Sequence, residues 1–176
     1  MNMTILRSRS AAPARHGEGP LPSAPAVRRR VALTREESLH LLASAPFGRI
    51  GAVDAGAPVM RPVNHLIVDG CVIVRTRRGS VLAALAASGG AGGVAAAYEA
   101  DQIDPATHTG WSVIVTGRMS LVADPREAAR YRLLLHPWVD QVSDRVLCLR
   151  PEAITGVRLT LRAARLEAGV GRLLGR

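Results

Sequence analysis

Lysine is absent from this sequence, because all 23 basic residues among its 176 are arginine. Such a chain has no Schiff-base lysine for pyridoxal phosphate chemistry and no P-loop lysine for nucleotide hydrolysis, which excludes two large classes of enzyme. Long hydrophobic runs are also missing: no 18 consecutive residues are all apolar and free of charge, so we expect no membrane-spanning helix. The length is enough to bury one core, and we expect a single domain.

Cysteine and clustered histidine are scarce as well. Cys71 and Cys148 are far apart in sequence and each lies among apolar residues, which is typical of small buried hydrophobic side chains with inert thiols. This cysteine usage favours a reducing, cytoplasmic compartment. The five histidines include no pair at a ligand spacing such as i, i+4, so we expect no metal site.

The net charge of +9 is unevenly distributed along the chain. Residues 1–30 carry six arginines and one glutamate, and residues 161–176 carry four arginines and one glutamate. Residues 31–160 are almost neutral, with thirteen arginines against twelve acids. Aromatic side chains for base stacking number only five in the whole chain. We therefore expect no specific nucleic-acid partner.

The same division predicts the domain organisation. Residues 1–30 are rich in proline and arginine without a hydrophobic period, which predicts a disordered basic tail. Residues 161–176 are expected to form a second tail or a frayed amphipathic helix, weakened by two glycines. The folded domain is expected to span residues 31–160.

Short β-branched runs separated by turn signals dominate the middle of the chain. Three helices are expected, at 35–45 after a capping box from Thr34 to Glu37, at 81–87 after Ser80, and at 125–135 after a second capping box that begins at Asp124. Six strands are expected, at 48–53, 58–68, 71–77, 94–100, 112–122 and 146–157. The predicted fold is mainly β: a six-stranded antiparallel split β-barrel with short flanking helices.

The segment from Arg75 to Ser80 has the features of an anion-binding turn. It leaves a predicted strand, turns at Gly79 and enters a helix at Ser80. Helix amides, hydroxyls and guanidinium groups together suit a phosphate monoester. An equally good interpretation at this point is that Ser80 is only an N-cap and that the arginines are solvated.

The order and spacing of several motifs resemble a known family. The motifs are Phe47-Gly48-Arg49-Ile50-Gly51, Pro58-Val59-Met60-Arg61-Pro62-Val63-Asn64-His65, Val74-Arg75-Thr76-Arg77-Arg78-Gly79-Ser80, Tyr98-Glu99-Ala100-Asp101, Gly110-Trp111-Ser112-Val113-Ile114-Val115-Thr116-Gly117 and Pro137-Trp138. Over residues 33–160 the chain is similar to the pyridoxamine 5'-phosphate oxidase-like FMN-binding split barrels, and more narrowly to the subgroup that includes nitroimidazole-resistance proteins.

This resemblance implies a cofactor, a site and a partner. The cofactor would be FMN, with its ring against Arg61, Pro62, Val63 and Asn64 and its ribityl phosphate near Thr76, Gly79 and Ser80. The family forms homodimers, which implies that Trp111 and Ser112 approach the cofactor of the partner subunit. Val81 stands where the family commonly has lysine, so we expect Arg75, Arg77 and Arg78 to supply the missing charge, with Arg75 and Arg77 on one strand face.

The function implied by the resemblance is a cytoplasmic FMN-dependent oxidoreductase that transfers electrons or hydride to a small molecule. No side chain is expected to act as a catalytic acid or base, because the flavin performs the chemistry. Two alternatives stay open on the same barrel: a non-catalytic protein that binds or sequesters a flavin or haem, and a deazaflavin-dependent reductase.

Overall fold

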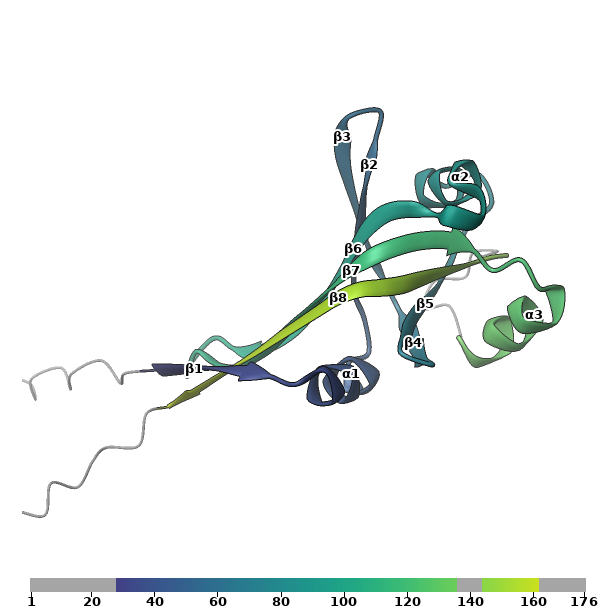
Figure 1. The fold of residues 1–176 in the computed structure, drawn as a ribbon. Helices are drawn as coiled ribbons and strands as arrows, with labels where there is room; N and C mark the ends of the chain where they lie inside the picture. Colours follow the sequence, from purple (N-terminus) through teal and green to yellow (C-terminus); the bar gives the residue numbers. More distant parts are fainter. Residues whose placement is uncertain (1–27, 136–143, 162–176) are drawn as a thin grey trace, which may run out of the picture.

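The computed structural model describes residues 28–135 and 144–161 (Figure 1). Its strands are β1 (Arg28–Leu33), β2 (Gly48–Asp54), β3 (Ala57–Val63), β4 (His65–Val68), β5 (Cys71–Thr76), β6 (Val94–Asp104), β7 (Thr109–Leu121) and β8 (Arg145–Leu161). Its helices are α1 (Arg35–Ser44), α2 (Val81–Ser88), α3 (Pro125–Leu134) and the short 3-10 helix η1 (Gly90–Gly92). The predicted mainly β fold, an antiparallel split barrel with short helices, is confirmed.

The prediction of six strands is wrong in two places. The predicted strand 58–68 is two strands, β3 and β4, separated by Asn64. Residues 28–30, expected in the disordered tail, begin β1, which pairs along the C-terminal part of β8. Main-chain hydrogen bonds and the bond from Arg28 Nε to the carbonyl of Thr107 hold this strand, and neither needs a hydrophobic period. The other residues of the two predicted tails, 1–27 and 162–176, lie outside the described part of the chain.

The helix starts follow their predicted caps. Thr34 and Glu37 make both bonds of a capping box at α1. Asp124 caps α3 by accepting the amide of Arg126, with Pro125 in the first turn. The predicted second capping box is wrong in its other half, because the Glu127 carboxylate does not bond back to the amide of Asp124. None of the helices in the described ranges is long and apolar enough to cross a membrane.

The sheet has the order β3-β2-β6-β7-β8-β5-β4, and every neighbouring pair is antiparallel. Strands β3 and β4 are therefore at opposite ends of the hydrogen-bonded order, although only Asn64 separates them in sequence. The sheet curls so that its two edges meet at this residue. At this point β3 and β4 are joined by the main chain at Asn64, but they are not paired with each other by hydrogen bonds. The barrel is therefore split between these two strands.

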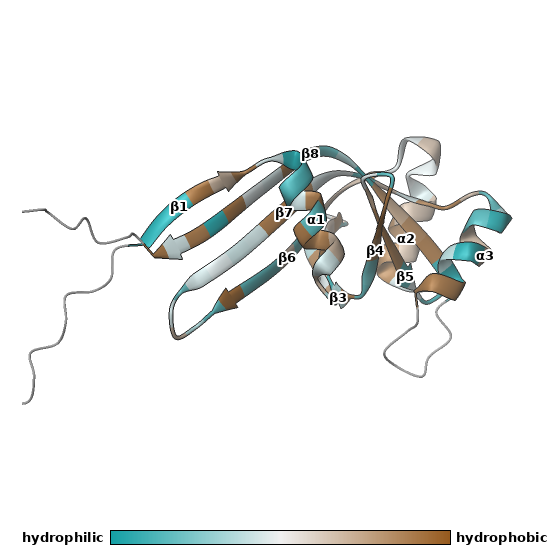
Figure 2. Cartoon of the chain, turned by 90° about the horizontal axis from the view of Figure 1, so that it is seen from below, coloured by the Kyte–Doolittle hydropathy of each residue, from teal (hydrophilic) through white to brown (hydrophobic). Residues whose placement is uncertain are grey.

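Strand β8 divides the molecule into two regions. Residues 145–149 pair with β5, whereas residues 156–161 pair with β1 on the same side. We call the second region the arm: β1 together with residues 101–104 of β6, 109–112 of β7 and 156–161 of β8. Figures 1 and 2 show the arm extending away from α2 and α3.

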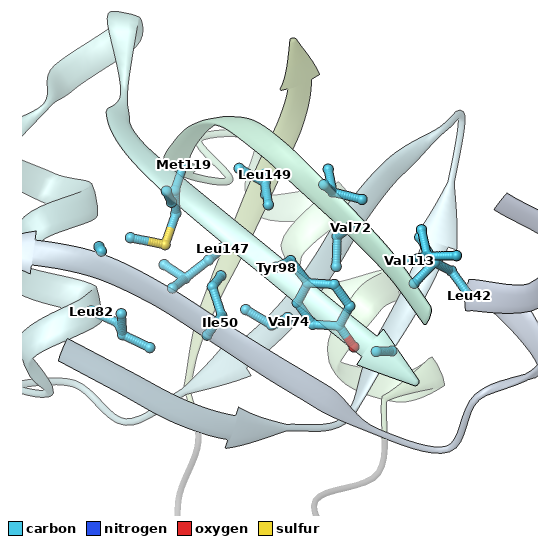
Figure 3. Close-up of a cluster of buried hydrophobic side chains, with 14 of the residues drawn as sticks. Leu42, Ile50, Val72, Val74, Leu82, Tyr98, Val113, Met119, Leu147 and Leu149 are labelled. Atoms are coloured by element: carbon cyan, nitrogen blue, oxygen red, sulfur yellow. The ribbon is translucent and has the colours of Figure 1, made fainter. Parts of the chain in front are cut away.

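The main core lies inside the barrel (Figure 3). Side chains from five strands and two helices converge there, and those labelled in Figure 3 include Leu42, Ile50, Val72, Val74, Leu82, Tyr98, Val113, Met119, Leu147 and Leu149. A smaller cluster outside the barrel packs Ala128, Tyr131 and Leu135 of the α3 region on Ile73 and Val146. Alternation along β5 explains both clusters, because Val72 and Val74 face inward and Ile73 faces α3.

Candidate functional site

The turn between β5 and α2 carries half of the predicted binding residues. Gly79 has a φ of 78°, a left-handed conformation that suits glycine and lets the chain turn into the helix. The hydroxyl of Ser80 caps α2 by accepting the amide of Ala83 at 3.1 Å, and it lies 2.8 Å from the hydroxyl of Thr76. The first amides of a helix have no carbonyl partner within it. This end of α2 therefore presents amide and hydroxyl donors side by side.

The three arginines near this turn have different surroundings. The Arg75 guanidinium donates to two main-chain carbonyls at the C-terminal end of α3, at 2.9 and 2.6 Å. Arg78 pairs through Nε with Asp144 Oδ2 at 3.0 Å, and this guanidinium holds the pKa of Asp144 below its usual range. Arg77 is exposed, and within the described residues its side chain makes no hydrogen bond or ion pair. Of the three, Arg77 is the guanidinium best able to turn toward an anion.

The expectation that Arg75 and Arg77 share a strand face is not met. Strand β5 ends at Thr76, so the two-residue alternation does not reach Arg77. Arg75 lies on the face of Ile73 and is used to bind the end of α3. Val81 is the first residue of α2 and is half-buried, so it brings no charge to the turn.

The segment from Arg61 to Asn64 lies next to this turn. His65 of β4 is opposite Val74 of β5, which puts the preceding Asn64 at the end of β5 that leads into the turn. Arg61 and Pro62 are exposed, and the Arg61 guanidinium donates to the carbonyl of Met60 at 2.7 Å. The barrel split thus brings the two predicted groups of binding residues, 61–64 and 75–80, to the same edge.

Trp111 and Ser112 lie far from the 76–80 turn within one chain, although Ser112 is nearer to segment 61–64. Ser112 is opposite Asp101, whose carboxylate pairs with Arg49, and Arg49 is opposite Pro62. Ser112 is opposite Val157 of β8, whereas Thr76 is opposite Arg145. Arg145 and Val157 are twelve residues apart in β8, which corresponds to about 40 Å along the extended strand. The Trp111 side chain is 5% exposed and belongs to the main core. Residues 137 and 138, the last motif of the resemblance, lie outside the described residues.

A buried polar pair under the edge was not anticipated from the sequence. The Tyr98 hydroxyl lies 2.6 Å from Nδ1 of His65, and Nε2 of the same ring lies 2.7 Å from the carbonyl of Leu42. A neutral ring that donates from Nε2 and accepts at Nδ1 satisfies both bonds. Burial lowers the pKa of His65 and raises that of Tyr98, so both groups stay uncharged near neutral pH. A lone histidine in an apolar strand was the only signal in the sequence.

The two cysteines are half-buried, not fully buried as expected from their apolar neighbours. Both are free, and burial together with the neighbouring Cys71 raises the pKa of Cys148 to about 12. Within residues 28–135 and 144–161, no group of three or more His, Cys, Asp or Glu side chains is arranged to hold a metal ion.

An apolar groove crosses the outside of the barrel. It has a volume of about 620 Å³ and runs over β2, β3, β6 and β7, with Gly51, Ala97 and Thr116 in its lining. Val53 and Met60 at the groove are largely exposed, as is Ile114 on β7. The groove is mostly apolar, and no residue of a described helix lines it.

Comparison with known proteins gives matches over most of the chain. The family model for pyridoxamine 5'-phosphate oxidase matches residues 34–158. The uncharacterized protein Rv0080 of Mycobacterium tuberculosis is 48% identical over 133 residues, which are 76% of this chain and 88% of that protein.

Solved structures share the fold. The FAD binding protein of Mycobacterium smegmatis is 27% identical with a TM-score of 0.56, over 73% of this chain and 98% of that one. A FAD-binding protein of Mesorhizobium loti has a TM-score of 0.61 at 16% identity, over 76% of this chain and 99% of that one. The split barrel and the family model lead to one assignment: this chain belongs to the pyridoxamine 5'-phosphate oxidase family.

Proposed function

We propose that this protein binds FMN and acts as a flavin-dependent oxidoreductase. The observation that carries the proposal is the hydroxyl pair of Thr76 and Ser80 at the N-terminus of α2, with Arg77 exposed beside it. Amides at a helix N-terminus, hydroxyls and a guanidinium are the donors that a phosphate monoester prefers. The Mycobacterium smegmatis relative binds FAD, which contains the same ring system and ribityl phosphate as FMN.

The residues divide into two roles. Thr76, Gly79 and Ser80 would hold the phosphate, with Arg77 supplying the charge that lysine brings elsewhere in the family. Segment 61–64 would lie along the ring, where main-chain groups can bind its polar edge. A bound flavin supplies electron or hydride transfer, so the protein needs only to orient it and exclude water.

The buried pair of His65 and Tyr98 has a positioning role in this proposal. Its hydrogen bonds tie β4, next to Asn64, to α1 and β6. Both polar ends of the imidazole are already bonded, and both residues are buried, so neither is available as an acid or base toward a substrate.

Ligand titration tests the phosphate contact. FMN should bind at least about tenfold more tightly than riboflavin, because a charge-assisted contact to phosphate contributes about 1.5 to 3 kcal/mol. Equal affinity for the two would overturn the proposal. FAD is included because the Mycobacterium smegmatis relative binds it, and FAD bound more tightly than FMN would replace FMN as the cofactor.

A pair of arginine variants locates the contact. Arg77→Gln should weaken FMN binding by about tenfold or more and leave riboflavin binding unchanged. Arg126→Gln, on the exposed surface of α3, is the matched control and should change neither. Equal effects of the two variants on FMN would remove Arg77 from the site.

Turnover separates an enzyme from a binding protein. Reduction of the bound flavin by NADPH or NADH, followed by re-oxidation by an acceptor, supports the oxidoreductase. A bound flavin that nicotinamide cofactors do not reduce supports the non-catalytic alternative, and a Soret band in the purified protein supports haem. Binding of a deazaflavin in preference to FMN supports the deazaflavin-dependent reductase.

We further propose a homodimer joined through the apolar groove face. Val53, Met60 and Ile114 expose apolar surface there, and burial against a second copy would remove it from water. A second copy would also bring a Ser112 within reach of the 76–80 turn, which one chain cannot do across about 40 Å of strand.

Light scattering tests the homodimer. The expected mass is twice the 18.6 kDa of the chain. Ile114→Glu should produce monomers because it buries a charge in the interface. Leu133→Glu, at an exposed apolar position on α3, should leave the dimer intact. A monomeric wild-type protein would reject the interface.

The cellular setting proposed is the cytoplasm, where both thiols remain reduced. We propose no specific nucleic-acid partner. Any binding to duplex DNA should be weak, independent of sequence and lost as salt is raised to physiological concentration, because it would come from counterion release by arginines. Tight binding that survives such salt would contradict this.

A further inference from the structure

A second cavity lies at the other end of α2 from the 76–80 turn. Its volume is about 460 Å³, and it is enclosed by the C-terminal part of α2, η1, α3 and the strands β5, β7 and β8. Figure 1 shows α2 and α3 at the end of the sheet opposite β1. Ala86 is the first residue of α2 that lines the cavity, and it lies six residues, or about 9 Å along the helix, from Ser80. The cavity is therefore distinct from the proposed flavin site.

The inner wall of the cavity is mostly apolar but includes two hydroxyl groups. Ile73, Leu121 and Val122 supply apolar surface. Ser120 and Tyr131 also line it and are 6% and 7% exposed. Within the described residues, neither hydroxyl has a hydrogen-bond partner. No side-chain nitrogen or oxygen atom in the described residues is both fully buried and without a partner, so these two hydroxyls are reached from the cavity and are available to a polar group of a ligand.

The rim of the cavity carries more negative than positive charge. Asp124 and Glu127 of the α3 region line it together with Arg150 of β8. Asp124 accepts the amide of Arg126 at 2.8 Å, and Glu127 has no ion pair among the described residues. The Glu127 carboxylate is close enough to Tyr131 to contribute, after burial, to a raised pKa of that phenol. Glu127 is thus an acceptor next to a protonated hydroxyl.

We propose that this cavity binds a small amphipathic amine, with the protonated amine at Glu127 and the apolar body against Ile73, Leu121 and Val122. Two carboxylates against one guanidinium favour a cation over an anion. The Ser120 and Tyr131 hydroxyls donate to or accept from the ligand's polar atoms. The volume accommodates a molecule with one aromatic ring and a short chain.

Matched probe compounds test the charge preference. Phenethylamine and 3-phenylpropionate have similar size and shape but opposite charge. Titration of labelled protein, followed by methyl NMR shifts of Ile73 and Val122, should show binding of the amine and at least about tenfold weaker binding of the acid. Equal binding of both, tighter binding of the acid, or no shift with either would overturn the proposal.

Variants locate the binding in the cavity. Glu127→Gln should weaken amine binding about tenfold or more, whereas Glu36→Gln in the first turn of α1 should not. Ala87→Phe fills the cavity from an exposed position of α2 and should abolish binding. Ala84→Phe, exposed on the same helix but outside the cavity lining, is its control. Amine binding unchanged in Ala87→Phe would show that the site lies elsewhere.

These experiments are independent of the proposed flavin. FMN affinity is measured alongside on each variant and should be unchanged, since none of these residues belongs to segments 61–64 or 75–80. Loss of amine binding with FMN affinity intact assigns the cavity as a separate site. Loss of both in Glu127→Gln would contradict that separation.

Discussion

The barrel and the arm use the same strands in different ways. In the barrel, β6, β7 and β8 present alternate side chains to an enclosed core, so Tyr98, Val113 and Leu147 have no exposed surface. In the arm, residues 101–104 of β6 are all exposed, whereas Trp111 of β7 is still part of the main core, and main-chain pairing to β1 is added along β8. Pairing alone sustains a strand only where a neighbouring core anchors it. The arm therefore depends on the barrel.

The largest expected contrast is between apolar deletions in the two regions. Leu147→Ala in the barrel core should lower the free energy of unfolding by about 2 to 5 kcal/mol, because it leaves a cavity. Ile103→Ala in the arm, where the side chain is 43% exposed, should change it by about 0.5 kcal/mol or less. Urea unfolding curves measure both. Comparable losses would show that the arm is part of the cooperative core.

The polar pair in the barrel gives the next largest effect. Tyr98→Phe keeps the ring but leaves Nδ1 of His65 buried without a donor, at a cost of about 1 to 3 kcal/mol. Tyr131→Phe is the control, because the Tyr131 hydroxyl has no partner among the described residues. If both variants were equally stable, the bond from Tyr98 to His65 would contribute nothing.

The junction between the two regions is tested at Gly156. A Cβ at this position would contact the Ser38 side chain of α1 and the Leu33 side chain of β1. Gly156→Ala should therefore destabilise the protein by about 1 to 3 kcal/mol through overpacking. Thr155→Ala, at the exposed neighbouring position, should change stability by about 0.5 kcal/mol or less. Thermal unfolding of the two variants decides whether α1 needs this close approach.

Acid should weaken the barrel through His65. Burial lowers the pKa of His65 in the folded state below the ordinary histidine value of 6.5. As the pH falls below 6.5, the unfolded chain therefore binds a proton at His65 more readily than the folded protein does. Stability contributed by the neutral ring is complete above pH 6.5 and decreases as the pH falls toward the lowered value. His65→Gln should flatten the decrease between pH 7.5 and 5.5.

The smallest expected effect is that of N-terminal truncation. Removal of residues 1–27 should leave the unfolding midpoint unchanged, because their sequence has no hydrophobic period. Removal of residues 1–33 deletes β1 and should increase amide hydrogen exchange at residues 156–161, with little change in the barrel. Protection at residues 156–161 that persists without β1 would contradict the proposed dependence of this edge on pairing.

Much of the fold could be predicted because local signals agreed with the tertiary structure. Two-residue turns at Ala55-Gly56 and Asp69-Gly70 have positive φ at both residues, as the turn signals implied. Strand β1 could not be predicted, because Arg28, Arg29 and Arg30 gain their structure from a partner more than a hundred residues away. The break at Asn64 was also missed, although Arg61, Pro62 and His65 interrupt the apolar residues around it.

The candidate site was only partly predictable for a related reason. The sequence indicated that Thr76, Gly79 and Ser80 form a turn at a helix start, which is a local property. It could not indicate which arginine stays available, because the partners of Arg75 and Arg78 come from α3 and Asp144. The pairing of His65 with Tyr98 was invisible for the same reason, as 33 residues separate them.

The pairing of β1 with β8 also bears on the order of events during synthesis. The first described strand finds its place only against the last, with Arg28 opposite Leu161. On the ribosome, β1 is synthesised long before β8, the strand with which it pairs. Strand β5 also pairs with β8, so this edge of the barrel stays unpaired until β8 has been synthesised. Hairpins such as β2-β3 and β4-β5 can form early, but the domain cannot be completed until β8 has left the exit tunnel. Such long-range closure predicts slow, late folding for a chain of this size.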